Sequence, residues 1–128
     1  MYDRGLALSA LGQMLHQADV VVERTAAVED IDGFLVSPSG MVLLDAVCMN
    51  LIALGEATKN LDKVTSGQLL PRYTEVRWEG VMRMRDKIAH HYFEVDAEVV
   101  LLTAKEDVPK IKRVIEKMID DLNENNNS

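Results

Sequence analysis

The feature that most constrains the fold is the segment from Pro38 to Asn60, which is apolar on nearly all sides as far as Leu54. If this segment is helical, it must be covered on several sides, as in the centre of a helical bundle or in a subunit interface. Its polar exceptions are Asn50 and Glu56. We interpret Asn50 as a core amide whose hydrogen bonds are satisfied. A helical bundle built around this segment follows.

The remaining apolar residues also repeat at helical spacing, every three or four positions. Two further long helices are predicted over 2–25 and 75–91, and a short one over 29–36. A last helix follows Asp96, which is a plausible cap, and should be kinked near Asp107-Val108-Pro109. No strand-like alternation is visible. The sequence therefore predicts an all-α, up-and-down bundle of four main helices plus short helices.

The composition fits one domain of this kind. The chain has 128 residues, 48% of them hydrophobic but only 5% aromatic, which suits helices packed through aliphatic side chains. Residues 1–122 are expected to form the single domain. Residues 123–128 are all polar and are expected to be a disordered tail.

Charge and cysteine content limit the possible functions. The net charge of −7 argues against nucleic-acid binding over the whole surface. Residues 71–91 nevertheless carry five basic and three acidic side chains, a local excess of +2. Cys48 is the only cysteine, so no disulfide framework is possible, and it reads as a small core residue. The apolar run 41–54 is interrupted by Asp45 and is short for a bilayer, so we expect a soluble, cytoplasmic protein without a membrane partner.

One arginine stands out in the predicted helix 75–91. Arg85 lies seven residues after Trp78 and seven before Tyr92, on the same predicted apolar stripe. An unpaired buried charge is costly, so Arg85 is expected to be paired or to face a cleft or a partner. The other members of the stripe are Val81, Met82, Ile88 and Ala89.

His90 lies five residues beyond Arg85, roughly 140° around an ideal helix. One straight helix cannot direct both side chains at one small target. Either the helix ends near His90, or a second copy of the motif completes the site. Both alternatives remain open from the sequence.

The pattern Arg85-x4-His90-x-Tyr92 resembles the R-x4–6-H motif of the HEPN ribonucleases. In its R-x4-H-x-Y form it resembles the HepT toxins, whose partners are minimal nucleotidyltransferase antitoxins. The likeness runs in matching order over about residues 2–120 and includes Phe34-Leu35, Asp45 to Ala57, Trp78, Phe93 to Asp96 and Asp107-Val108-Pro109. It implies a HEPN-type fold that forms a homodimer or a higher oligomer, with a composite cleft where two motif helices meet.

The resemblance also implies a chemistry that needs no metal and no cofactor. RNA supplies its own nucleophile, the 2′-hydroxyl beside each phosphate. His90 would be the acid/base, because an imidazole titrates near neutral pH. Arg85 would hold the phosphate charge. Asp86 would orient a catalytic group or hold the paired helix, and His91 would contact the RNA backbone or simply end the helix favourably.

Three further residues have two interpretations each. Tyr92 closes the apolar stripe as a packed ring, or, by the resemblance, accepts AMP from the nucleotidyltransferase. Arg83 and Lys87 would steer RNA by the resemblance and are otherwise solvent-facing. A metal site is not expected, because His90 and Glu94 share helical spacing but no third ligand joins them.

The leading hypothesis is therefore an endoribonuclease toxin neutralised by AMP transfer to Tyr92. The alternative is a non-catalytic helical binding module that docks a nucleotidyltransferase and serves as its target. The acidic net charge favours this alternative, because RNA affinity would have to come from a small patch. A structural dimerisation bundle is the third interpretation.

Overall fold

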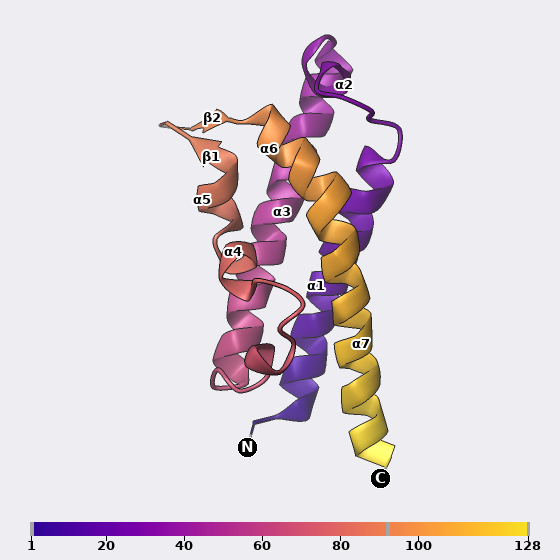
Figure 1. Cartoon of the computed structure of the whole chain (residues 1–128), viewed down its shortest axis with the longest axis vertical. Helices are drawn as coiled ribbons and strands as arrows, with labels where there is room; N and C mark the ends of the chain where they lie inside the picture. Colours follow the sequence, from indigo (N-terminus) through magenta and orange to yellow (C-terminus); the bar gives the residue numbers. More distant parts are fainter. Residues whose placement is uncertain (1, 92, 128) are drawn as a thin grey trace.

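Three long helices dominate the structure, a computed structural model that describes residues 2–91 and 93–127, without the side chains of 125–127. They are α1 (Arg4–Thr25), α3 (Pro38–Val64) and α7 (Val108–Asn127). Helix α1 packs mainly against α3 and α7, and the chain alternates in direction between successive long segments (Figure 1). The predicted mostly helical, up-and-down arrangement is confirmed.

Side-chain caps set the starts of α1 and α3. The Asp3 carboxylate accepts a hydrogen bond from the Leu6 amide at 3.0 Å, and the Ser37 hydroxyl accepts one from the Gly40 amide at 3.0 Å. Each cap satisfies one of the backbone donors that a helix start leaves without a partner. Helix α1 thus begins two residues later than predicted. Helix α3 begins at Pro38 as predicted and ends at Val64, four residues beyond the predicted end.

Helix α3 is 27 residues long, and its most apolar window has a mean hydropathy of 1.6, so by length and composition it could cross a membrane. This corrects the expectation of a segment too short to do so. The apolar side chains have a different use in this fold, because α3 contacts α1, α2 (Asp32–Leu35), α4 (Trp78–Met82) and α5 (Met84–Ile88). Such contacts are typical of the central helix of a bundle.

Asn50 is a satisfied amide, as predicted. Its Nδ2 donates to Oε1 of Gln17 at 2.8 Å, and its Oδ1 accepts from Nη1 of Arg24. Both partners are on α1, so these hydrogen bonds join α1 to α3 in addition to their apolar contacts. Cys48 is 7% exposed, and burial together with the nearby Asp45 charge raises the pKa of its thiol to about 11. It is the core residue that the sequence indicated.

The short connecting elements differ from the prediction in extent. Helix α2 covers four residues, and only its Phe34 is buried, while Leu35 is exposed. It packs closely on the start of α3, where a Cβ on Gly40 would overlap the carbonyl oxygen of Gly33. The connection after α3 contains a 3₁₀ helix at Leu70–Arg72.

The last helix is interrupted by a π-helical turn. The segment consists of α6 (Ala97–Leu102), the π turn η2 (Thr103–Asp107) and α7. Asp96 caps α6 as predicted, accepting from the amides of Glu98 and Val99 at 3.1 Å. Pro109 has no N–H to donate, so the regular hydrogen-bond ladder cannot pass through this point. The structure thus has a π turn where the sequence predicts a kink, and the Asp107 side chain pairs with Lys87.

The apolar stripe predicted for α7 is buried, and its members are Ile111, Ile115, Met118 and Leu122. The backbone of residues 123–127 continues this helix. That the polar tail is disordered in solution stays a prediction.

Candidate functional site

The segment that carries the motif is not one continuous helix. Helices α4 and α5 are separated at Arg83, whose φ and ψ are −101° and 23°. The prediction of a single helix over 75–91 is therefore wrong. Tertiary contacts fix the short α4. The Trp78 indole donates to the Tyr73 carbonyl at 2.8 Å before the first turn, and Gly55 of α3 lies against the carbonyl oxygen of Val81 near its end.

The break at Arg83 changes which residues face the core. Met84 and Ile88, four residues apart, are 1% and 2% exposed, whereas Arg85 and Ala89 are exposed. Arg85 is therefore not on the buried stripe, contrary to the prediction. Within the described part of the chain its guanidinium makes no hydrogen bond or ion pair. It remains available to a ligand or a partner.

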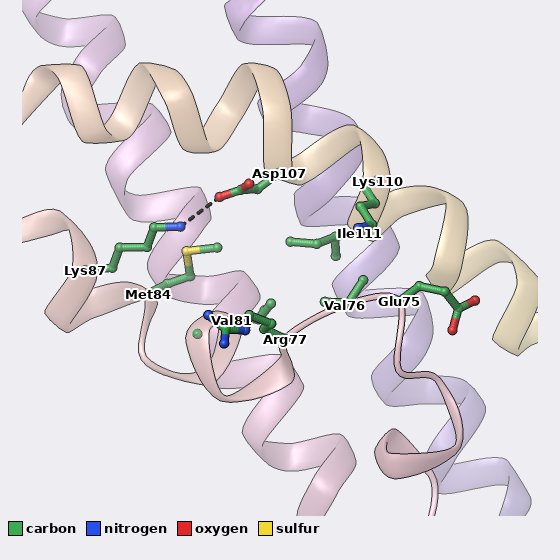
Figure 2. Close-up of a pocket in the computed structure, with 10 residues that line it drawn as sticks. Glu75, Val76, Arg77, Val81, Met84, Lys87, Asp107, Lys110 and Ile111 are labelled. Atoms are coloured by element: carbon green, nitrogen blue, oxygen red, sulfur yellow. Dashed lines mark hydrogen bonds and ion pairs between the residues drawn. The ribbon is translucent and has the colours of Figure 1, made fainter.

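Arg85 and Lys87 project from opposite flanks of α5. With about 100° per residue, each lies roughly 80° from the core-facing direction set by Met84 and Ile88, and Asp86 points outward between them. Lys87 faces η2, where its ammonium group lies 2.7 Å from Oδ2 of Asp107 (Figure 2). Arg85 therefore lies on the flank of α5 that faces away from η2.

His90 lies just beyond the end of α5. The chain becomes extended at Ala89 and forms a two-stranded hairpin, β1 (Ala89–His90) and β2 (Glu94–Val95), with His90 opposite Glu94. This corrects the prediction that no strand forms. The helix ends two residues before His90, which bears out the first of the two alternatives, and whether a second copy of the motif completes the site stays a prediction. The angle calculated for a continuous helix no longer applies.

The turn of the hairpin exposes both histidines. The His90 and His91 rings are 4.0 Å apart, centroid to centroid, with their planes at 63°. His91 lies three residues beyond the last residue of α5, so it does not end that helix. It has a φ of 42°, and its carbonyl accepts from the Glu94 amide at 3.0 Å. Phe93 also has a positive φ, 81°, and is 87% exposed. Tyr92 lies outside the described residues, so neither interpretation of its side chain is tested.

An apolar strip on α3 is also exposed. Val42 is 68% and Met49 66% exposed, and we define the α3 strip as these two residues with the half-buried Ile52 and Ala53. The exposed acids Asp45 and Glu56 lie on the same face of the helix. Measured from Gly55, Met49 lies about 120° around the helix in one direction. Asn50, which bonds α1, lies about 140° in the other.

Since Gly55 contacts Val81 and Met84, the α3 strip lies on the side of α3 away from α1, beside the α4–α5 segment. Sequence reasoning recognised the apolar character of this helix but not which residues stay uncovered. The buried residues of α3 recur every three or four positions, and Val42, Met49 and Ile52 fall outside that series. This difference in helical position could have identified them as uncovered.

A pocket of about 390 Å³ lies between α4–α5 and η2–α7 and was not predictable from the sequence (Figure 2). Its lining comes from segments roughly 30 residues apart in the chain, which only the tertiary fold brings together. No group of three potential metal ligands occurs within the described residues. The expectation of metal-independent chemistry stays a prediction.

Comparison with known proteins adds sequence relatives. The chain is 37% identical over 77 residues to a protein of Methanocaldococcus jannaschii provisionally named an RNase, a match covering 60% of each chain. It is 40% identical over 73 residues to the "Probable ribonuclease HepT" of Thermococcus cleftensis, covering 57% of this chain and 63% of that one. A provisionally named RNase of Caldanaerobacter subterraneus is 27% identical over 109 residues, covering 85% and 90%.

The chain spans 60% and 63% of the lengths of the first two of these relatives, and 50% of the length of a further Methanocaldococcus jannaschii protein to which it is 30% identical over 118 residues. No solved structure is similar enough to count as a match. The model of the family described as "Ribonuclease HepT-like" matches residues 14–118, which contain α3, the α4–α5 segment, the hairpin and the start of α7. The chain therefore belongs to the HepT-like ribonuclease family.

Proposed function

We propose that this protein is a metal-independent endoribonuclease toxin that acts as a homodimer, with Arg85 and His90 in a composite site. The observation that carries the proposal is that Arg85 is exposed and makes no hydrogen bond or ion pair within the described residues, on a segment that packs against α3. A second copy covering the α3 strip would bring its own Arg85 and His90 to the same edge. The exposed Phe93 and Val95 of the hairpin would extend the contact.

The chemistry follows from the side chains that this surface presents. His90 takes a proton from the 2′-hydroxyl or gives one to the leaving oxygen, and Arg85 stabilises the charge that develops on the phosphorane. Asp86, which points outward from α5, and His91, whose ring touches that of His90, are positioned to support this site. Arg83 steers RNA toward it. Lys87 contributes less, because Asp107 already neutralises its charge.

RNA cleavage tests this proposal directly. Purified protein is incubated with total RNA and excess EDTA, and the Arg85→Ala and His90→Ala variants are compared with it. Loss of either group should reduce the cleavage rate by at least about a hundredfold. Arg113→Ala and His16→Ala are matched controls on α7 and α1, and they should cleave as the wild type does. Equal cleavage by all five proteins would indicate a contaminating nuclease and remove the assignment.

We further propose that a minimal nucleotidyltransferase neutralises the toxin by transferring AMP to Tyr92. The basis is the R-x4-H-x-Y pattern, since an added nucleotide would place bulk and negative charge beside the RNA site. Incubation with the partner and ATP should add AMP to the wild type and not to Tyr92→Phe, as measured by intact mass. Tyr73→Phe is the control, because the Tyr73 hydroxyl donates to Asp121 at 2.7 Å and its pKa is raised by burial and by that bond. An AMP adduct on Tyr92→Phe would exclude Tyr92 as the acceptor.

The second candidate function is a non-catalytic module that docks the nucleotidyltransferase. The net charge of −7 and the neutralisation of Lys87 favour it, because they leave few cations for RNA. This candidate predicts that expression of the protein alone does not arrest growth, although AMP transfer to Tyr92 still occurs. Growth arrest that Arg85→Ala abolishes would decide for the ribonuclease.

A further inference from the structure

A pocket of about 390 Å³ lies on the flank of α5 that carries Lys87 (Figure 2). One wall is the α4–α5 segment with the loop before it, and the other is the end of η2 with the first turn of α7. Lys87 and Asp107 point toward one another from the two walls. Because Arg85 and Lys87 are about 200° apart around α5, this pocket is separate from the proposed ribonuclease site.

The floor of the pocket is apolar. It is formed by Val76, Val81, Met84 and Ile111, each of which is at most 8% exposed. Gly80 also lines the pocket, and a Cβ built on it would meet no heavy atom within 4 Å, so open space lies beside α4 at this point. A volume near 390 Å³ over an apolar floor is within the range of small-molecule sites, at their smaller end.

The charged residues of the lining are unevenly neutralised. Both acids have cationic partners, since Asp107 pairs with Lys87 at 2.7 Å and Glu75 with Lys117 at 3.5 Å. Arg77 and Lys110 also line the pocket, from opposite walls, and neither makes an ion pair within the described part of the chain. The lining thus presents two cations without an ionic partner, Arg77 on one side of the apolar floor and Lys110 on the other.

We propose that this pocket binds a small amphipathic anion, an organic phosphate or carboxylate with a flat or aliphatic body. The anionic group would lie between Arg77 and Lys110, and the apolar body would cover Val81 and Met84. Complementary charge and an apolar floor are together what recognise such a molecule. Met84 precedes Arg85 and touches the region of Gly55, so an occupied pocket would also contact the helix that carries Arg85.

Calorimetric titration of the intact protein with three probes tests the proposal without any assay of RNA cleavage. The probes are AMP, octanoate and inorganic phosphate. AMP and octanoate represent the two chemical sources of an amphipathic anion, and phosphate carries the charge alone. We expect one organic anion to bind with a Kd below about 1 mM and phosphate to bind at least about tenfold more weakly. At about ten times its Kd the bound anion should raise the unfolding midpoint by roughly 5 °C.

Two variants with matched controls locate the site. Arg77→Ala combined with Lys110→Ala should weaken binding by at least about tenfold, while Arg72→Ala combined with Arg113→Ala, which removes the same charge elsewhere, should not. Gly80→Leu should abolish binding by filling the open space without a backbone clash. Gly12→Leu is its control, because a Cβ on Gly12 of α1 also meets nothing within 4 Å.

The binding results either identify the class of ligand or overturn the proposal. Tight binding of AMP alone identifies an organic phosphate, and tight binding of octanoate alone identifies a carboxylate with an aliphatic body. Equal binding of all three probes would reduce the site to surface charge and overturn the proposal. So would the absence of binding by both organic anions, or binding that survives in Gly80→Leu and in the double variant. None of these results depends on whether the protein cleaves RNA.

Discussion

Four threonine side chains are buried, and three of them use their hydroxyls in the same way. Thr25, Thr58 and Thr65 each donate to the carbonyl oxygen four residues earlier, at 2.7 to 2.8 Å. Thr103, at the start of the π turn, is 1% exposed, and within the described residues its hydroxyl has no hydrogen-bond partner. A buried polar atom without a partner lowers stability.

Replacing this hydroxyl with a methyl group should therefore not destabilise the protein. We expect Thr103→Val to leave the free energy of unfolding unchanged or to raise it by up to about 1 kcal/mol. Thr58→Val, which loses a 2.7 Å hydrogen bond to Leu54 in an equally buried place, should lower it by about 1 kcal/mol. Urea unfolding of both variants provides the comparison. Equal destabilisation would mean that the Thr103 hydroxyl has a partner in solution, such as an ordered water.

At the scale of elements, the position of α5 depends on a close approach to α3. A Cβ on Gly55 would lie 2.8 Å from the carbonyl oxygen of Val81 and 3.2 Å from Cβ of Met84. The first of these contacts is with backbone, which cannot move aside as a flexible side chain can. Only glycine therefore allows the α4–α5 segment to lie where it does.

Gly55→Ala should push this segment away from α3. We expect the free energy of unfolding to fall by about 1–3 kcal/mol and the amides of α5 to exchange faster with solvent. Gly12→Ala on α1, which meets no neighbour, should instead raise stability by up to about 1 kcal/mol. Urea unfolding and hydrogen exchange measure both effects. Unchanged exchange in α5 would show that the close approach does not position it.

The same elements show what the sequence could and could not predict. The long helices were predictable, because buried residues recur at every turn of α1, α3 and α7 and identify the period over many residues. The break at Arg83 was not, because the end of α4 packs against Gly55 of α3, a tertiary contact that no local pattern shows. The two-residue strands are too short to alternate visibly. The candidate residues were therefore found by motif and spacing, but their orientation depended on tertiary contacts.

For the whole molecule, the uncovered α3 strip predicts self-association. Wild-type protein should be a dimer in sedimentation-velocity experiments at micromolar concentration, and Met49→Glu should be mainly monomeric, because a charge at the centre of an apolar interface weakens it strongly. Leu6→Glu is the control, because Leu6 is 53% exposed but lies on α1. It should leave the dimer intact. A monomeric wild type, or dissociation by Leu6→Glu alone, would place the contact elsewhere or exclude it.

The π turn Thr103–Asp107 also fixes the relation between the two halves of the last helix. A π turn amounts to one residue inserted into an α-helix, and each residue accounts for about 100° of rotation. Deleting one residue there would rotate α6 by about 100° relative to α7. This rotation would move Val100, which is fully buried, toward water. Insertions and deletions in Thr103–Asp107 should thus be tolerated less well than substitutions, although most of its side chains are at the surface.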